Sequence, residues 1–201
     1  MTSPHSTLAP SAWVRRWSHL VAPGGAVLDV ACGAGRHVRW FTERDCRVTG
    51  VDRDASALQP LAAIAEVVVA DIENGPWPFS GRRFDAVVVT NYLWRPLLPV
   101  IMASVADGGV LIWETFSAGN ETVGKPSNPL FLLRPGELLG RVHGLRVAAF
   151  EEGYEDHPPR FVQRIVAVRE GLAATRPKRH PLSAGAPASG QVKSADSEDP
   201  P

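Results

Sequence analysis

Five stretches of Val, Ile and Leu, each about as long as a β-strand, constrain the fold of this chain more than any other feature. Their apolar residues are continuous rather than alternating with polar ones, which is typical of strands buried on both faces of a parallel sheet. The stretches cover residues 26–32, 47–52, 66–71, 83–93 and 108–116. Apolar residues at helical spacing fill 55–65, where Asp54 is placed to cap a helix and Pro60 is expected to break it. This alternation of strands and helices predicts a doubly wound α/β fold.

Two further strands are expected near the carboxyl end of the chain, at residues 145–153 and 160–169. The segment between them, which contains the sequence DHPPR, is too short for a crossover helix and therefore predicts a hairpin. One strand of a hairpin must run against the other. The sequence thus predicts a Rossmann-like sheet of seven strands, mostly parallel, with helices on both faces and one antiparallel strand near the C-terminus.

The length and composition of the chain suit one folded domain. It has 201 residues, of which 44% are apolar, enough for the core of a single domain. Residues 170–201 are rich in Pro, Ala, Gly, Ser and charge and hold almost no large apolar side chains, a composition typical of disorder. Residues 1–10 look similar. We therefore expect a domain over 11–169, between a flexible N-terminus and a disordered tail.

Charge and cysteine content argue against several classes of protein. Basic and acidic side chains number 21 each, so the chain has no overall positive charge for a nucleic-acid backbone, and no nucleic-acid partner is expected. The apolar runs are shorter than the roughly 20 residues of a membrane helix, and no signal peptide is recognisable. Cys32 and Cys46 form no CxxC pair and the histidines form no HxH or HxxxH pattern, so no metal site is expected. A cytoplasmic protein without a membrane partner fits these features.

A turn of small residues follows the first strand. The strand contains Asp29 near its end, and the sequence ACGAG at residues 31–35 then leads into a helix. Gly33 and Gly35 have no Cβ atom, so they can adopt positive φ and let a ligand approach the backbone. The alternative is a glycine turn that only connects strand to helix. His37, in the first turn of the helix, is expected at the surface or just behind the site.

Polar residues also follow the next three strands. Asp52 ends the second strand, roughly 20 residues beyond the first turn, where doubly wound folds place an acid that binds ribose hydroxyls; its alternative role is to cap the next helix. Asp71 can accept a hydrogen bond from an adenine amino group while the Ile72 N–H donates to the ring, unless Asp71 is only a loop cap. Asn91 and Tyr92 follow the fourth strand. Because the carboxyl ends of parallel strands share one edge, these residues predict a single ligand site there.

With these motifs, the chain resembles the class I methyltransferases that use S-adenosylmethionine (SAM), over about residues 26–168. Their glycine motif, D/E-x-G-x-G-x-G, is similar to DVACGAG in this chain, with Ala31 in the place of the first glycine. The segments DIENGPWPF and ETFSAGN…PSNPLFLLRPGEL look like the branch that includes small-molecule and tellurite-type methyltransferases. The resemblance implies a donor site that begins at the glycine turn, binds ribose and adenine through the acids above, and places Asn91 and Tyr92 at the methyl-transfer end. The implied donor-binding residues are Asp29, Ala31, Cys32, Gly33, Gly35, Asp52, Arg53, Asp71, Ile72, Asn91 and Tyr92.

The implied reaction is an SN2 transfer of the SAM methyl group to a small-molecule acceptor, which the sequence does not identify. Two alternatives stay open: a SAM-binding module without catalysis, and an NAD-dependent oxidoreductase. The second needs G-x-G-x-x-G, and Val38 stands where its third glycine would be. The sequence does not indicate an oligomeric state.

Some acceptors must lose a proton, and a few residues are candidates for the base that would remove it. The candidates are Tyr92, Glu114, His143 and His157.

Two segments are candidates for binding the acceptor. Trp13 belongs either to an amphipathic helix that packs on the core or to a cap that faces the donor. The segment 115–134 is long, polar in its first half and apolar in its second, and predicts a flap that contacts the acceptor through Asn120 and Phe131. The alternative is a surface loop with an apolar anchor.

Overall fold

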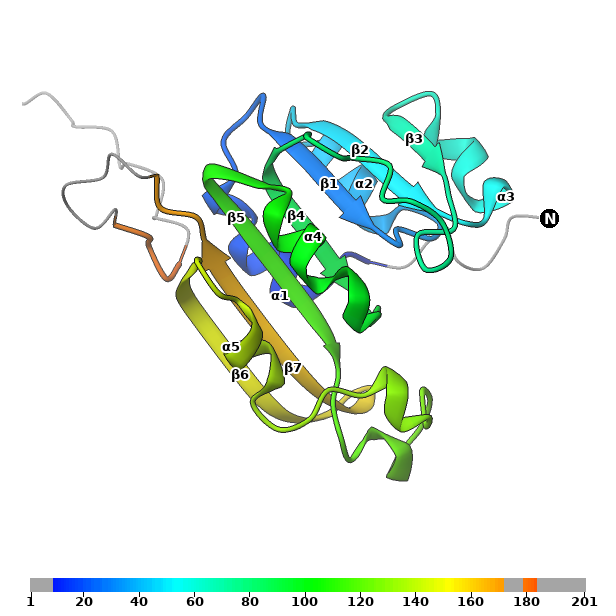
Figure 1. Cartoon of the computed structure of the whole chain (residues 1–201), viewed down its shortest axis with the longest axis vertical. Helices are drawn as coiled ribbons and strands as arrows, with labels where there is room; N and C mark the ends of the chain where they lie inside the picture. Colours follow the sequence, from blue (N-terminus) through cyan, green and yellow to red (C-terminus); the bar gives the residue numbers. More distant parts are fainter. Residues whose placement is uncertain (1–8, 172–178, 184–201) are drawn as a thin grey trace, which may run out of the picture.

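The computed structural model describes residues 9–171 and 179–183 and is built around a seven-stranded sheet (Figure 1). The strands are β1 Ala26–Val30, β2 Arg47–Asp52, β3 Glu66–Val69, β4 Phe84–Thr90, β5 Val105–Phe116, β6 Arg146–Asp156 and β7 Pro159–Val168. They lie in the order β3-β2-β1-β4-β5-β7-β6. β1 to β5 are parallel, whereas β7 runs antiparallel to both β5 and β6. The predicted fold is confirmed.

Short helices cover both faces of the sheet. They are α1 Ala12–Trp17, α2 Arg36–Thr42, α3 Ala55–Leu58, α4 Leu98–Ala103 and α5 Glu137–Arg141, with 3-10 turns η2 Ser18–Leu20, η3 Gln59–Leu61, η4 Arg95–Leu97, η5 Asn120–Thr122 and η6 Pro129–Phe131. α1 and α2 lie on one face, and α4 and α5 lie on the other (Figure 1). Neighbouring strand residues therefore enter different cores: Val87 packs with the residues of α4 and α5, and Val88 packs with those of α1 and α2. This explains why the strands are apolar on both sides.

The helix predicted over residues 55–65 breaks at Pro60, as expected. Asp54 caps its start, because Oδ1 accepts a hydrogen bond from the Ser56 N–H at 2.9 Å. The α-helix ends shortly before Pro60, and a 3-10 turn continues the chain. Proline has no N–H with which to extend an α-helix.

Two strands end earlier than their apolar runs suggest. β3 stops at Val69, before Asp71, and β4 stops at Thr90, before Asn91. Asn91 has a positive φ of 54°, which turns the chain out of the sheet directly after β4. Both polar residues are therefore placed just beyond the carboxyl edge of the sheet.

β6 and β7 form the predicted hairpin, with His157 in its turn. β7 pairs with β5, so the edge strand is β6 and not the last strand of the chain. The tip of the hairpin extends past the end of β5, since Phe161 in β7 still accepts a hydrogen bond from the Ser117 N–H at 3.0 Å. It therefore reaches the same edge as the carboxyl ends of the parallel strands.

Residues 1–8, 172–178 and 184–201 lie outside the described part of the chain, so most of the predicted flexible N-terminus and disordered tail falls there. Within 179–183, the carbonyl oxygen of Pro181 lies 3.0 Å from His19 Nε2. No helix in the described ranges has the length and apolar character to cross a bilayer. The same residues contain no cluster of three or more His, Cys, Asp or Glu side chains that could hold a metal ion.

Candidate functional site

The turn that follows β1 is wound by three residues with positive φ. Ala31, Gly33 and Gly35 have φ values of 53°, 52° and 75°. A Cβ atom on Gly35 would collide with the side chain of Leu61, whereas one on Gly33 would meet no atom within 4 Å. Gly35 is therefore required by packing, while the space beside Gly33 is open to a ligand.

Asp52 joins this turn to the end of β2. Its Oδ2 accepts a hydrogen bond from the Gly33 N–H at 2.8 Å, and its Oδ1 accepts one from the Asp54 N–H at 3.0 Å. Capping of α3, the alternative role considered for Asp52, falls to Asp54 instead. An ionised carboxylate has about four acceptor positions, so Asp52 keeps acceptor capacity for a ligand.

Two cavities meet at Ala31 and Asp52, on the carboxyl edge of the sheet. The larger has a volume of about 680 Å³ and is bounded by the glycine turn, α2 and the end of β4. The smaller, of about 280 Å³, is bounded by the loops that follow β2, β3 and β4. They lie where the strand order reverses between β1 and β4, which is where open α/β sheets bind ligands.

Ten of the eleven predicted donor-binding residues line one of these cavities. Ala31, Cys32, Gly33, Gly35, Asp52 and Asn91 line the larger one, and Ala31, Asp52, Arg53, Asp71, Ile72 and Tyr92 line the smaller one. Asp29 lies among the lining residues of neither.

In the smaller cavity, Asp71 is held by its own loop. Oδ1 accepts hydrogen bonds from the N–H groups of Glu73 and Asn74, and Oδ2 accepts one from Asn74 Nδ2 at 2.9 Å. The Asn74 side-chain hydrogen bond, with the backbone ones, lowers the pKa of Asp71. Tyr92 also lines this smaller cavity and not the larger one; burial and the nearby Glu73 raise the pKa of its hydroxyl.

Asp29 and His37 are buried together beneath the glycine turn. Each is 1% exposed, and His37 Nδ1 lies 3.9 Å from Asp29 Oδ2. His37 Nε2 lies 3.1 Å from the backbone nitrogen of Ser11, which can only donate, so Nε2 is the unprotonated nitrogen of a neutral ring. Burial lowers the pKa of His37 to about 3 and raises the pKa of Asp29 to about 8. His37 is thus a buried residue that ties α1 to α2, and of its two expected positions it occupies the one just behind the site and not the surface.

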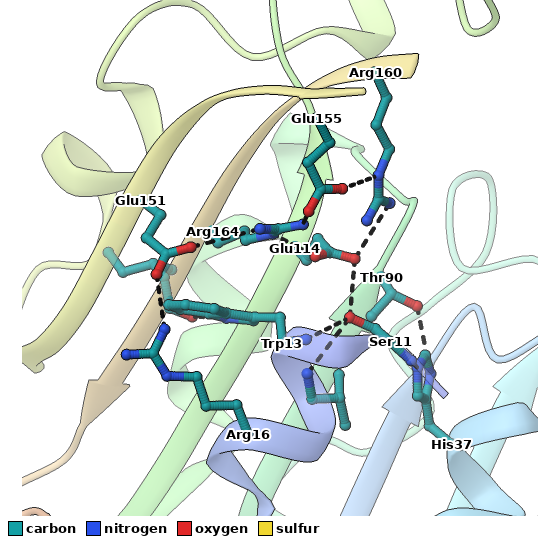
Figure 2. A network of polar contacts seen from close by, with 12 residues as sticks. Ser11, Trp13, Arg16, His37, Thr90, Glu114, Glu151, Glu155, Arg160 and Arg164 are labelled. Atoms are coloured by element: carbon teal, nitrogen blue, oxygen red, sulfur yellow. Dashed lines mark hydrogen bonds and ion pairs between the residues drawn. The ribbon is translucent and has the colours of Figure 1, made fainter. Parts of the chain in front are cut away.

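A network of ion pairs links α1 to the β6–β7 hairpin and passes through Glu114 (Figure 2). The Glu114 carboxylate is 1% exposed and accepts a hydrogen bond from Ser11 Oγ at 3.0 Å. It pairs with Arg160 at 3.4 Å and with Arg164 at 2.5 Å, and Arg164 pairs in turn with Glu155. The Glu114 carboxylate is therefore occupied by Ser11 and two guanidinium groups, and it holds α1 on the hairpin.

The other candidate bases also lie away from the larger cavity. His143 is exposed between α5 and β6, at the amino end of β6 and hence at the opposite edge of the sheet. His157 is exposed in the hairpin turn. Neither lines either cavity, and Tyr92 lines only the smaller one. The structure therefore places none of the four candidates on the wall of the larger cavity.

Trp13 does not face the donor site. It is 3% exposed, packs in the core beneath α1, and its Nε1 lies 3.5 Å from the carbonyl oxygen of Ile165. Its role is the packing one, because the amphipathic helix turns both of its tryptophans into the core.

The segment predicted as a flap is a surface loop with an apolar anchor. Leu133 is fully buried, whereas Phe131 is 41% exposed and lines neither cavity. Asn120 is 1% exposed; its Oδ1 accepts from the Phe161 N–H at 3.2 Å and its Nδ2 donates to the Pro126 carbonyl at 3.0 Å. Because both ends of its amide are used inside the protein, Asn120 holds the loop on the hairpin and does not contact an acceptor.

Arg36 and Thr90 also line the larger cavity, and neither was predicted. Arg36 directly follows Gly35, and Thr90 directly precedes Asn91. Their places beside motif residues are the signal that could have identified them.

The fold and the glycine-turn site agree with a comparison to known families. Residues 27–108, which include the glycine turn and the polar residues after β2, β3 and β4, match the family model described as a methyltransferase domain. Over these residues the chain is thus similar to methyltransferases.

Among curated proteins, the chain is similar to two methyltransferases. It is 32% identical to malonyl-[acyl-carrier protein] O-methyltransferase of Serratia marcescens over 107 residues, which are 49% of this chain and 41% of that protein. It is 29% identical to ribosomal RNA small subunit methyltransferase H of Gemmatimonas aurantiaca over 160 residues, 75% of this chain and 49% of that protein. The chain thus spans less than half of the length of either relative.

Solved structures share the fold at low sequence identity. TehB from Haemophilus influenzae has a TM-score of 0.64 and 18% identity, covering 84% of this chain and 64% of that one. A TehB-like SAM-dependent methyltransferase from Corynebacterium glutamicum has a TM-score of 0.61 and 18% identity, covering 83% of this chain and 91% of that one.

Proposed function

We propose that this protein transfers a methyl group from SAM to a small-molecule acceptor, and that the two adjoining cavities hold the donor. The observation that carries the proposal is the position of Asp52. It lies where the cavities meet, its carboxylate is anchored by the Gly33 N–H, and it keeps acceptor capacity for the two hydroxyl groups of a ribose. The adenine would then occupy the smaller cavity and the amino-acid part of SAM the larger one.

The residues around the site fit such a donor. The open space beside Gly33 admits a ligand against the backbone, and Ile72, which is 6% exposed, gives the smaller cavity an apolar wall for an aromatic ring. When bound, SAM supplies an electrophilic methyl group, which passes to a lone pair of the acceptor as the S–C bond breaks and leaves S-adenosylhomocysteine (SAH). The protein contributes orientation, which can lower a barrier by about 7–11 kcal/mol in favourable cases.

The site does not offer a base for the acceptor. Among the described residues that line the larger cavity, Asp52 and Asp54 are bound to backbone N–H groups, and His37 is neutral with its Nε2 occupied. An acceptor that is already nucleophilic at neutral pH suits this arrangement best, with any proton it carries released to water.

A small molecule is the acceptor class that the chain's own features favour. The balance of 21 basic and 21 acidic side chains provides no overall charge for RNA, and the larger cavity is of a size suited to a small ligand. A structural neighbour with a TM-score of 0.59, coclaurine N-methyltransferase, was solved with N-methylheliamine and SAH. The relatives named for malonyl-[acyl-carrier protein] and ribosomal RNA make those two the competing acceptor classes.

Two measurements test the proposal. Calorimetry should detect binding of SAH and not of NADH, whereas NADH binding without SAH binding would favour the oxidoreductase alternative. Methyl-labelled SAM incubated with a cell extract should then label the small-molecule fraction. Label in RNA or in a carrier protein would refute the acceptor class, and SAH binding without any labelling would favour a module that binds SAM without catalysis.

A further inference from the structure

Arg36, the first residue of α2, places a cation on the wall of the larger cavity. Among the described residues, its one hydrogen bond to another side chain runs from Nη2 to Thr90 Oγ1 at 3.5 Å, beyond the usual distance for such a bond. No carboxylate of the described residues lies within ion-pair distance of it. Arg36 is thus a partly buried guanidinium with most of its five donors unused.

Two other partly buried arginines of this protein, Arg95 and Arg164, are neutralised by a carboxylate. Arg95 forms a two-pronged pair with Glu137, at 2.8 Å for both contacts, and Arg164 pairs with Glu114. These partners raise the pKa of Arg95 and of Arg164. The pKa of Arg36 is lowered instead, chiefly because burial removes water from the charge. A partly buried charge without a counter-charge lowers the stability of the folded protein unless a ligand of opposite charge binds to it.

The carboxylates that act on Arg36 from further away do not neutralise it. Glu114 attracts it but is shared by Arg160 and Arg164, and Arg160 in addition repels Arg36 as a like charge. Asp29 is buried, and its pKa of about 8 keeps most of it uncharged at neutral pH. Neither carboxylate therefore neutralises Arg36 on the cavity wall.

Arg39, the other arginine on this wall, is used differently. Its Nη1 donates to the carbonyl oxygens of Ala34 and Gly35, at 2.5 and 3.3 Å. It therefore stabilises the glycine turn, and its guanidinium is not free for a ligand in the way that of Arg36 is.

We propose that Arg36 is an anion-binding residue that takes a carboxylate or a similar oxyanion of a ligand in the larger cavity. The planar guanidinium can donate two parallel hydrogen bonds to such a group. The proposal rests on the methyltransferase function proposed above and adds a ligand chemistry to it. Two sources provide this chemistry: the amino-acid carboxylate of the donor, and an anionic group of the acceptor.

The test compares Arg36→Gln and Arg36→Lys with Arg44→Gln. Arg44 is an exposed arginine just beyond the end of α2 that stacks on Trp40 outside both cavities, so its substitution makes the same change in net charge. Calorimetry is run with SAH, with 5′-methylthioadenosine, which lacks the amino-acid carboxylate, and with sulfate added to the SAH complex at constant ionic strength. Melting temperatures confirm that each variant is folded.

Two results support the proposal and separate the sources. If Arg36 binds the donor carboxylate, Arg36→Gln weakens SAH binding by about 10-fold or more and leaves methylthioadenosine binding unchanged. If it binds an acceptor anion, both nucleosides bind normally but the SAH complex of Arg36→Gln loses the sulfate binding that the unmodified protein shows. In either case Arg36→Lys retains part of the affinity, since it keeps the charge and loses the two-pronged geometry.

The proposal is overturned if Arg36→Gln behaves like Arg44→Gln with all three probes. This outcome is distinct from failure of the proposed function, in which the unmodified protein would not bind SAH at all.

Discussion

Gly33 and Gly35 lie two residues apart in the same turn, and substitution by alanine should have a different main effect at each: weaker SAH binding at Gly33 and lower stability at Gly35. Both have positive φ, which costs a residue with a Cβ atom about 1–2 kcal/mol. The turn tolerates this cost once already, because Ala31 has a φ of 53°. The difference lies in the surroundings: the new methyl group collides with Leu61 at Gly35 and meets open space at Gly33.

The two variants should therefore separate stability from binding. Overpacking adds about 1–3 kcal/mol, so Gly35→Ala should lose about 2–5 kcal/mol of unfolding free energy and Gly33→Ala about 1–2 kcal/mol. At about 2–4 °C per kcal/mol for a domain of this size, Gly35→Ala should have clearly the lower melting temperature. Gly33→Ala should instead weaken SAH binding, by about 10-fold or more, because its methyl group occupies the space proposed for the donor.

Thermal unfolding of both variants, followed by calorimetry with SAH at a temperature where both are folded, measures these effects. Equal losses of melting temperature would refute the packing argument. Unchanged SAH affinity in Gly33→Ala would show that the space beside Gly33 is not where the donor lies.

Three further predictions concern the polar residues of the site. Asp52→Ala should weaken SAH binding about 10- to 150-fold by calorimetry, since charge-assisted hydrogen bonds contribute about 1.5–3 kcal/mol, and Asp52→Asn should lose less because it keeps one acceptor oxygen. Glu114→Gln should lower the unfolding free energy by about 3–5 kcal/mol in urea titrations, because Arg164 loses its ion pair with the buried carboxylate of Glu114. A loss below about 1 kcal/mol would contradict the structure. Asp29 keeps its proton up to about pH 8 in the folded protein but loses it above about pH 3.8 in the unfolded one. The unfolding free energy, measured relative to that of Asp29→Asn, should therefore fall as the pH rises from 5 to 7, by up to about 1.4 kcal/mol per pH unit. Parallel pH profiles of the two proteins would exclude this burial effect.

The fold, and the gathering of the proposed donor-binding residues at one edge of the sheet, were predictable because they depend on short-range patterns. Strand runs, the glycine turn and the polar residue after each strand are contiguous in sequence, and a parallel sheet necessarily brings the carboxyl ends of its strands to one edge. Asp52 and Asp71 were placed correctly by this rule alone, since it needs no knowledge of side-chain contacts.

The acceptor side was not predictable, because it depends on partners that are remote in sequence. Asn120 is polar and lies in a polar loop, yet its amide oxygen accepts a hydrogen bond from the backbone N–H of Phe161, 41 residues away. Glu114 was a candidate base, but its carboxylate lies outside both cavities and pairs with Arg164, 50 residues away. Arg36 was overlooked because two of its features appear only in the folded structure: its place on the wall of the larger cavity, and the lack of an ion-pair partner there among the described residues.

The bonds from Ser11 to His37 and Glu114 have a consequence for how the protein is made. Glu114, the hydroxyl partner of Ser11, is made 103 residues after it. At synthesis rates of 5–20 residues per second, this delay is roughly 5–20 s. During that time α1 has no β5 to pack on, so the packing of Trp13 and Trp17 stays incomplete. The contacts that fix Ser11 beside His37, behind the larger cavity, are therefore completed by β5, a strand that lines neither of the two cavities.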